Sequence, residues 1–198
     1  MLFIGKVIRL QVQRSSLKTN SHTGDRIERR YDPSSLLSAE RLDIDSNGVT
    51  GIFASNARVI DVHNRRHIES KNIPKKNDVS LGFTSHYESM RRRFGAHITD
   101  GIAGENIIIE TMALFDQGVL GSRLVFVADG RNCLQLENPS PAEPCEPFSK
   151  WALHDPSLQS ADPIIGQTLK FLRNGMRGYY SSCRENGRVE VGNDVFAD

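Results

Sequence analysis

The sequence predicts a mainly β protein whose strands form a closed or partly open barrel, with a few short helices. Short segments rich in branched apolar residues recur along the chain, turn signals such as Ser46-Asn47-Gly48 separate them, and few stretches have helical periodicity. Many short strands joined by turns are typical of barrels. The 198 residues contain no internal repeat and no clear linker, so we expect a single domain over residues 1–198.

The first strand is expected at residues 2–13, where apolar and polar residues nearly alternate. Alternation places Val7 on one face of this strand. The opposite face carries Ile4, Ile8, Leu10 and Val12.

A polar excursion follows at about residues 15–40. It contains several cations, among them Lys18 and Arg29, and is broken at Pro33-Ser34-Ser35. Long irregular segments are uncommon inside compact domains and are usually functional or disordered. We therefore expect an irregular loop here.

The middle of the chain continues in β structure. Strands are expected at 42–45, 49–53 and 57–62, joined by turns in an antiparallel arrangement. A polar link at 72–78 precedes another strand at 79–83.

A helix is expected to begin at Ser85, because Ser85-His86-Tyr87-Glu88 has the spacing of a capping box. Tyr87, Met90 and Phe94 form a narrow apolar stripe on this helix, and Gly95 ends it.

The second half should contain strands at 106–110, 123–128 and 133–137, of which the last two form a hairpin. Helices are expected at 148–153 and 162–172.

Two closing strands are expected around Asn186-Gly187. A two-residue loop would place Cys183 opposite Glu190, whereas a three-residue loop would place it opposite Val189. We favour the second register because it gathers four side chains on one face, namely Tyr179, Cys183, Val189 and Val191.

Charge and composition indicate a cytoplasmic protein with no global attraction to polyanions. Lys plus Arg number 25 and Asp plus Glu 24, which gives a net charge of +1. We expect neither a nucleic acid nor a membrane as partner. Three cysteines at irregular spacing fit a reducing compartment, and neither a signal peptide nor a membrane-spanning segment is apparent.

Cys145 lies in a segment that prolines at 141, 144 and 147 stiffen. Such a loop can present a nucleophile or a metal ligand, but surface loops also contain prolines as turn residues, so the residues alone equally allow an inert buried thiol. If Pro147 lies in the first turn of a helix, the positive helix end favours the Cys145 thiolate. Glu143 and Glu146 act in the opposite direction, and Arg177 or an arginine of the 15–40 excursion is the candidate cation. Cys133 and Cys183 lie in expected strands, so we expect both in the core.

Three segments in order carry a family resemblance: Gly101-Ile-Ala-Gly-Glu-Asn106, Pro144-Cys145, and Gly175-Met-Arg-Gly178 followed by residues 187–194. Together they resemble the MOSC family, the domain found at the C-terminus of molybdenum cofactor sulfurases and in standalone bacterial proteins. The resemblance covers roughly residues 42–196, together with the opening strand. It implies a MOSC barrel of the pyruvate-kinase-barrel-like type, in agreement with the strand pattern.

The resemblance also implies site residues. Cys145 matches the cysteine that carries sulfur or ligates molybdenum, so it is the expected catalytic and metal-binding residue. Glu105, Asn106 and Arg177 match the cofactor-binding motifs. Many members have an arginine shortly before the Pro-Cys pair, where this chain has Ala142-Glu143.

Considered as residues alone, these positions allow structural roles as well. Glu105 and Asn106 could bind a pterin or phosphate, or could pin the preceding turn to neighbouring backbone. Arg177 could bind an anion or lie exposed on a strand. His63 and His67 are four residues apart, but their region resembles a turn or strand, so we expect no metal site there. The basic groups Arg65-Arg66, Lys75-Lys76 and Arg91–Arg93 are expected to be solvated faces.

Two functions remain open, and both require Cys145. In the first, a molybdenum-dependent oxidoreductase binds the molybdenum cofactor through Cys145 and reduces N-hydroxylated or related substrates. It would need an electron-donor protein, because the chain has no flavin, iron–sulfur or nicotinamide motif. In the second, Cys145 is a sulfur carrier that receives persulfide sulfur from a pyridoxal-phosphate-dependent cysteine desulfurase for metal–sulfur cofactor assembly. A noncatalytic barrel would remain if Cys145 proved buried and unreactive.

Overall fold

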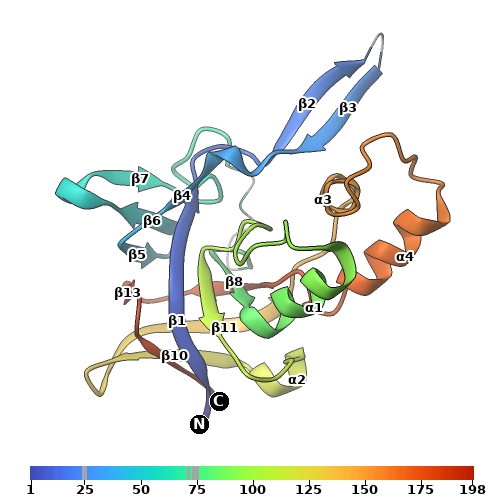
Figure 1. Ribbon diagram of the computed structural model, residues 1–198. Coiled ribbons are helices and arrows are strands. Elements are labelled where there is room, and N and C mark those ends of the chain that lie inside the picture. The colour runs from blue at the N-terminus through green and yellow to red at the C-terminus, as the bar shows by residue number, and fades with distance from the viewer. Residues whose placement is uncertain (24–25, 71, 73–75) are drawn as a thin grey trace.

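Seven strands close into a barrel in the computed structural model, which describes residues 1–23, 26–70, 72 and 76–198 (Figure 1). The ring closes because the last strand pairs with the first, with Leu2 opposite Ala197. In order around the ring the strands are β1 (Leu2–Gln13), β14 (Asp194–Ala197), β10 (Arg123–Ala128), β11 (Arg131–Pro141), β12 (Tyr179–Cys183), β8 (Val79–Phe83) and β9 (Ile107–Glu110). The predicted β barrel is confirmed, and so is the hairpin of β10 and β11.

One pair in the barrel is parallel. β8 and β9 run side by side with Leu81 opposite Ile107, and helix α1 (Thr84–Phe94) connects them. Parallel neighbours need such a crossover and are covered on both faces, which explains why every residue of β8 is buried.

The predicted capping box at the start of α1 is wrong. Phe83 occupies the N-cap position, because the chain passes directly from β8 into the helix. The Ser85 hydroxyl instead lies 2.8 Å from Thr111 Oγ1 and donates to the Ala113 carbonyl at 2.7 Å.

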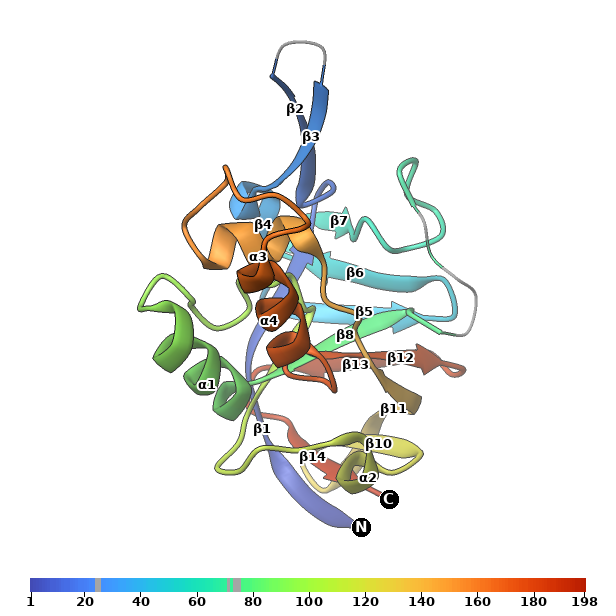
Figure 2. The ribbon, with the colours of Figure 1, turned by 90° about the vertical axis from the view of Figure 1, so that its right-hand side faces the viewer.

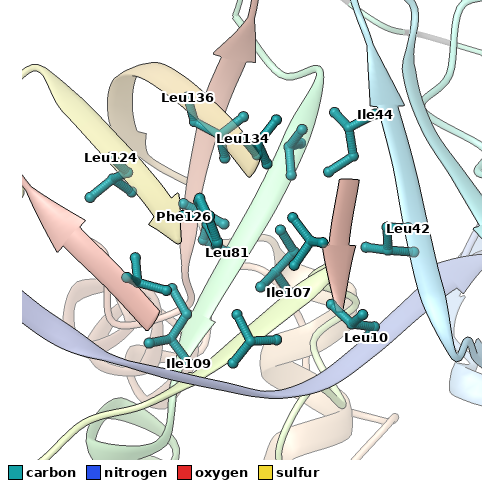
Figure 3. Close-up of a cluster of buried hydrophobic side chains, with 14 of the residues drawn as sticks. Leu10, Leu42, Ile44, Leu81, Ile107, Ile109, Leu124, Phe126, Leu134 and Leu136 are labelled. Carbon is teal, nitrogen blue, oxygen red and sulfur yellow. The ribbon is translucent and has the colours of Figure 1, made fainter. Parts of the chain in front are cut away.

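A second sheet of four strands packs beside the barrel and shares its core. Its order is β13 (Gly187–Glu190), β5 (Arg41–Asp45), β6 (Gly48–Ile52) and β7 (Arg58–Ile60). Figure 3 shows Leu42 and Ile44 of β5 in one apolar cluster with Leu10 and Ile107 of the barrel. The antiparallel strands predicted around the turn at residues 46–48 are confirmed.

The predicted closing hairpin is wrong in both registers. Cys183 of β12 lies opposite Leu136 of β11, whereas Val189 of β13 lies opposite Leu42 of β5. Both edges of β12 are taken by barrel neighbours, β11 and β8, so β13 crosses to the second sheet. Tyr179, Cys183 and Val189 are nevertheless buried, but Val191 is exposed.

The first strand departs from strict alternation. Val7 is fully buried and Ile8 is 37% exposed. The prediction had placed Ile8, and not Val7, on the same face as the buried Ile4. The pairing with β9 shifts register between Val7 and Arg9, and such a bulge changes the face on which later side chains lie.

The polar excursion is ordered into strands, contrary to the prediction of an irregular loop. β2 (Lys18–Thr23) and β3 (Arg26–Tyr31) form a hairpin that stands away from the barrel (Figures 1 and 2). Its base is buried through Leu17 and Tyr31, whereas residues 18–20 and 29–30 are exposed. A 3₁₀ turn, η1 (Pro33–Ser35), and a short strand, β4 (Leu36–Ser38), return the chain to β1.

Short helices gather on one side of the barrel (Figure 1). Besides α1 they are α3 (Glu146–Ala152) and α4 (Pro163–Leu172), close to the predicted ranges. The one-turn helix α2 (Gln117–Leu120), the 3₁₀ turn η2 (Ala54–Asn56) and strand β14 were not predicted. A second apolar cluster, which includes Tyr31, Tyr87 and Phe148, fills the space between α1, α3 and the hairpin base. Within the described residues, no helix is both long and apolar enough to cross a membrane.

Candidate functional site

The turn at 101–104 is held by side chains from several distant parts of the chain. Each of its carbonyl oxygens accepts a hydrogen bond from a different side chain. In order from Gly101 to Gly104, the donors are Gln11 Nε2 (2.7 Å), Tyr31 OH (2.6 Å), Arg177 Nη2 (3.1 Å) and Gln13 Nε2 (2.6 Å). This turn therefore fixes the position of Glu105 and Asn106, which follow it.

Glu105 is a buried carboxyl group with one satisfied oxygen. Its Oε2 accepts a hydrogen bond from Tyr87 OH, which itself accepts from the Ala103 N–H at 3.1 Å. Its Oε1 is buried and has no hydrogen-bond partner among the described residues. Burial raises the pKa of Glu105 to about 7, although the Tyr87 hydrogen bond and the Arg177 charge both lower it.

Gly178 makes room for this carboxyl group. Its φ of +112° already favours glycine, and a Cβ atom at this position would lie 2.8 Å from Glu105 Oε1. The segment Gly101–Asn106 and the segment Gly175–Gly178, which carry two of the family motifs, therefore meet at Glu105.

Arg177 lies in the connection before β12 and is half-buried, not exposed on a strand. Its guanidinium packs 5.4 Å from the centre of the Phe148 ring and donates to the Ala103 carbonyl. Burial opposes its charge, but the net direction of the Arg177 pKa is upward because acidic groups surround it. These groups are Tyr180, Cys145, Tyr31 and Glu105.

Asn106 lies behind the site, with every hydrogen-bonding group of its side chain in use. Its Oδ1 accepts from the N–H and the hydroxyl of Ser80, at 3.1 and 2.9 Å. Its Nδ2 donates to Gln11 O at 3.3 Å and to Asp61 Oδ2 at 2.9 Å. For Asn106 the structure thus shows the pinning contacts that the sequence left open.

A cavity of about 610 Å³ opens between the hairpin base and the barrel. Glu105 and Arg177 line it, as do His63, Tyr31 and Tyr180. Lys18 and Arg29 contribute from the hairpin, and Ala142 and Glu143 from the segment before Cys145. The described residues that line this cavity do not include Cys145.

Cys145 is half-buried beside the cavity, at the N-cap position of α3. Pro147 lies in the first turn of α3, as predicted, and the thiol packs on the second apolar cluster. Arg177 is a cation within electrostatic range of Cys145. The negative charge of Glu146 is largely balanced by other groups, because Glu146 forms an ion pair with Lys150 at 2.9 Å and accepts a hydrogen bond from the Ser160 hydroxyl at 2.7 Å.

The other cysteines pack against the core. Cys183 is buried, and Cys133 is half-buried with its thiol 3.3 Å from the Phe126 carbonyl. Burial raises the pKa of both thiols, that of Cys183 to about 12.

The two histidines of the His63–His67 pair face different groups. His63 Nδ1 lies 3.0 Å from Asp61 Oδ1, and His67 Nε2 lies 3.2 Å from the Arg14 carbonyl. Among the described residues, no group of three or more His, Cys, Asp or Glu side chains is placed to hold a metal ion. The contact of His63 with Asp61 was not predicted from the sequence, in which the spacing Asp61-Val62-His63 was the available signal.

Several arginines of the basic runs form ion pairs within the chain. The pairs are Arg65 with Asp78 (3.1 Å), Arg66 with Asp45 (3.2 Å) and Arg91 with Asp100 (2.6 Å). Asp78 is buried, so Arg65 is part of the packing and not only a solvated surface charge. Lys75 lies outside the described residues.

Replacing Glu105 with glutamine should change how stability depends on pH. A neutral Glu105 stabilises the fold fully below its ordinary pKa of 4.5, and this contribution is lost as pH rises through the folded value of about 7. One pKa unit corresponds to about 1.4 kcal/mol, so the wild type should lose on the order of 3 kcal/mol relative to Glu105→Gln between pH 4.5 and 8.

Urea unfolding of both proteins across this pH range measures the difference. Glu143→Gln, an exposed glutamate on the same cavity wall, is the control and should follow the wild type. Parallel stability curves for wild type and Glu105→Gln would show that Glu105 does not titrate in the buried state.

Comparison with known proteins places the chain in a family. A family model described as the MOSC domain matches residues 64–196. Among solved structures, the YuaD protein from Bacillus subtilis is similar with a TM-score of 0.52 and 15% identity, over 97% of each chain.

Two further solved structures are more distant. A hypothetical protein has a TM-score of 0.51 at 12% identity, covering 83% of this chain and 65% of that chain. YiiM from Geobacillus stearothermophilus has a TM-score of 0.48 at 14% identity, covering 100% of this chain and 74% of that chain. At these identities the likeness to solved structures shows the fold alone. A comparison with curated proteins found no match to the chain. Because the family model spans more than half of the sequence and the barrel agrees with it, the protein belongs to the MOSC domain family.

Proposed function

We propose that this protein binds a molybdenum cofactor that extends from the cavity to Cys145 beside it, with Cys145 as the protein ligand of the metal, and that it reduces N-hydroxylated substrates. The observation that carries the proposal is the position of Arg177. Its side chain lines the cavity and lies within electrostatic range of Cys145. The same positive charge can therefore act on the Cys145 thiol and on a ligand in the cavity.

The residues present fit such a cofactor. A volume of about 610 Å³ is in the usual range of roughly 300–1,000 Å³ for small-molecule sites. A thiolate is a soft ligand suited to a metal that also binds sulfur. Arg177 lines the cavity, and its planar guanidinium suits an anionic group of the cofactor.

The hairpin supplies further positive charge. Lys18 and Arg29 line the cavity from the hairpin, and both suit a phosphate group. Many family members have an arginine shortly before the Pro-Cys pair, where this chain has Ala142-Glu143. Lys18 and Arg29 could supply the positive charge that this arginine supplies in those members. Lys18 and Arg29 are therefore the residues we assign to the phosphate of the cofactor.

When bound, the cofactor supplies the two-electron chemistry, and the protein supplies binding, orientation and protons. Arg177 is held in place by the Ala103 carbonyl and by the Phe148 ring. Tyr31 and Tyr180 provide aromatic surface beside it. A separate protein must donate the electrons, because the sequence has no flavin, iron–sulfur or nicotinamide motif.

Molybdenum content should depend on Cys145. In a host that makes the cofactor, wild-type protein should retain molybdenum near one equivalent, and Cys145→Ser should retain at least tenfold less, because hydroxyl is a poor substitute for a thiolate ligand. Metal analysis of the purified proteins measures this.

Cys133→Ser is the matched control, because Cys133 is also half-buried but packs on the barrel core. It should keep the wild-type amount of metal. Full molybdenum in Cys145→Ser would contradict the proposal. A persulfide on Cys145 in wild-type protein that lacks molybdenum would favour the sulfur carrier instead.

A further inference from the structure

Asp61 and His63 form a carboxylate–imidazole pair in the wall of the cavity. The Asp61 side chain is 1% exposed, whereas that of His63 is 28% exposed and lines the cavity. The two side chains meet through Asp61 Oδ1 and His63 Nδ1 at 3.0 Å. Asp61 Oδ1 also accepts from the backbone N–H of His63 at 2.9 Å.

This contact determines which ring nitrogen of His63 faces the cavity. An ionised carboxylate only accepts hydrogen bonds, so Nδ1 carries the proton that is donated to Asp61. Among the described residues, no hydrogen bond involves His63 Nε2. Since Nδ1 is committed to Asp61, Nε2 is the ring nitrogen that is left to act in the cavity.

Asp61 is held rigidly in this position. Its Oδ2 accepts from the N–H of Gln13 at 2.7 Å and from Asn106 Nδ2 at 2.9 Å. Asn106 is fixed in turn by Ser80. The asparagine of the Gly104-Glu105-Asn106 motif is thus connected to the cavity through Asp61 and His63, and not by its own side chain.

His63 is better placed for proton transfer than Glu105, the buried carboxyl group at the cavity. Both oxygens of the Glu105 carboxyl are committed or enclosed, because Oε2 binds Tyr87 and Oε1 is sealed from solvent. The Nε2 edge of His63 has neither restriction. A carboxylate that fixes the tautomer and orientation of a histidine is a recurrent device in acid–base catalysis.

We propose that His63 is the proton-transfer residue of this cavity and that Asp61 and Asn106 are its positioning residues. The proposal rests on the function proposed above. Reduction of an N-hydroxylated amine takes two electrons from the donor protein and two protons, breaks the N–O bond, and forms the amine and water. Nε2 first takes a proton from solvent, which makes the ring an imidazolium with Nδ1–H still donated to Asp61. Its Nε2–H then gives the proton to the departing oxygen, solvent gives the other proton to nitrogen, and the ring returns to the tautomer protonated on Nδ1.

The first test needs no cofactor. Long-range ¹H–¹⁵N correlation spectra of the full chain at pH 8 should show His63 as the tautomer protonated on Nδ1. The spectrum of His63→Ala assigns the signal. A His63 ring protonated on Nε2 would overturn the proposal.

The second test uses molybdenum-loaded protein with phenylhydroxylamine as the probe and a reduced viologen as the electron donor. His63→Ala should lower kcat by about 10²-fold or more at wild-type molybdenum content, with KM changed much less. Added imidazole should restore part of the rate. His67→Ala, a nearby histidine that does not line the cavity, should match the wild type.

The two proposals fail in different ways. A His63→Ala rate equal to the wild-type rate, at normal molybdenum content, would overturn the role of His63 alone. A lowered rate that added imidazole does not restore would indicate a structural role for His63, and would also overturn its role in proton transfer. Absence of molybdenum from the wild-type protein would overturn the proposed function, and the His63 step with it.

Discussion

Replacing Gly175 with alanine should destabilise the protein by about 4 kcal/mol, from the usual costs of overpacking and of a left-handed backbone. Gly175 has a φ of +87°, and a Cβ atom there would overlap the ring of Tyr179. That ring cannot withdraw easily, because Tyr179 is fully buried in the barrel core and its hydroxyl donates to the Phe115 carbonyl at 3.2 Å. The Gly175 carbonyl also accepts from His86 Nδ1 at 2.9 Å.

Gly192→Ala separates the backbone effect from the overlap. Gly192 has a similar φ of +95°, but no heavy atom lies within 4 Å of the position of its Cβ. Its alanine variant should lose only about 1 kcal/mol. Urea unfolding with unchanged slopes measures both losses. Equal losses in the two variants would show that the Tyr179 ring is not packed against Gly175 as described.

Replacing Asp61 with asparagine should cost about 3 kcal/mol or more, although the two side chains have the same shape. Asp61 accepts four hydrogen bonds from His63, Gln13 and Asn106. An asparagine must turn its NH₂ group toward one pair of these donors, which leaves buried donors unpaired. The same change should free the His63 ring from the tautomer described above.

Asp116→Asn is the matched control for this substitution. Asp116 is exposed and caps α2 by accepting from the Val119 N–H at 3.1 Å, a role that asparagine fills equally well. Its unfolding free energy should change by less than about 0.5 kcal/mol. An Asp61→Asn protein as stable as Asp116→Asn would rule out the buried acceptor role of Asp61.

The fold could be predicted where local pattern and long-range pairing agree. The strand at 79–83 was recognisable from the alternating apolar residues Val79, Leu81 and Phe83, and the helix after it from its amphipathic stripe. The closing hairpin failed because a turn signal at Asn186-Gly187 does not reveal which strand edges are already occupied. The β2–β3 hairpin was missed because its strands stand away from the core and lack apolar alternation.

The site could be predicted only in part, because some of its residues belong to sequence motifs and others are brought together only by the fold. Motifs separated in sequence drew attention to Glu105, Arg177 and Cys145, and the fold places the first two on one cavity with Cys145 beside it. Asp61 and His63 were not predicted, because their pairing depends on the buried network through Asn106, and a spacing of two residues alone is common. The cations of the hairpin were noted in the sequence, but only the folded hairpin shows that Lys18 and Arg29 reach the cavity.

The most direct test of molybdenum ligation by Cys145 is X-ray absorption at the molybdenum K-edge, with selenocysteine incorporated at position 145. The cofactor-loaded protein should show a selenium atom in the first coordination sphere of molybdenum, and selenocysteine at position 133 should show none. A molybdenum spectrum without selenium scattering from position 145, at full metal content, would contradict the assignment of Cys145 as the metal ligand.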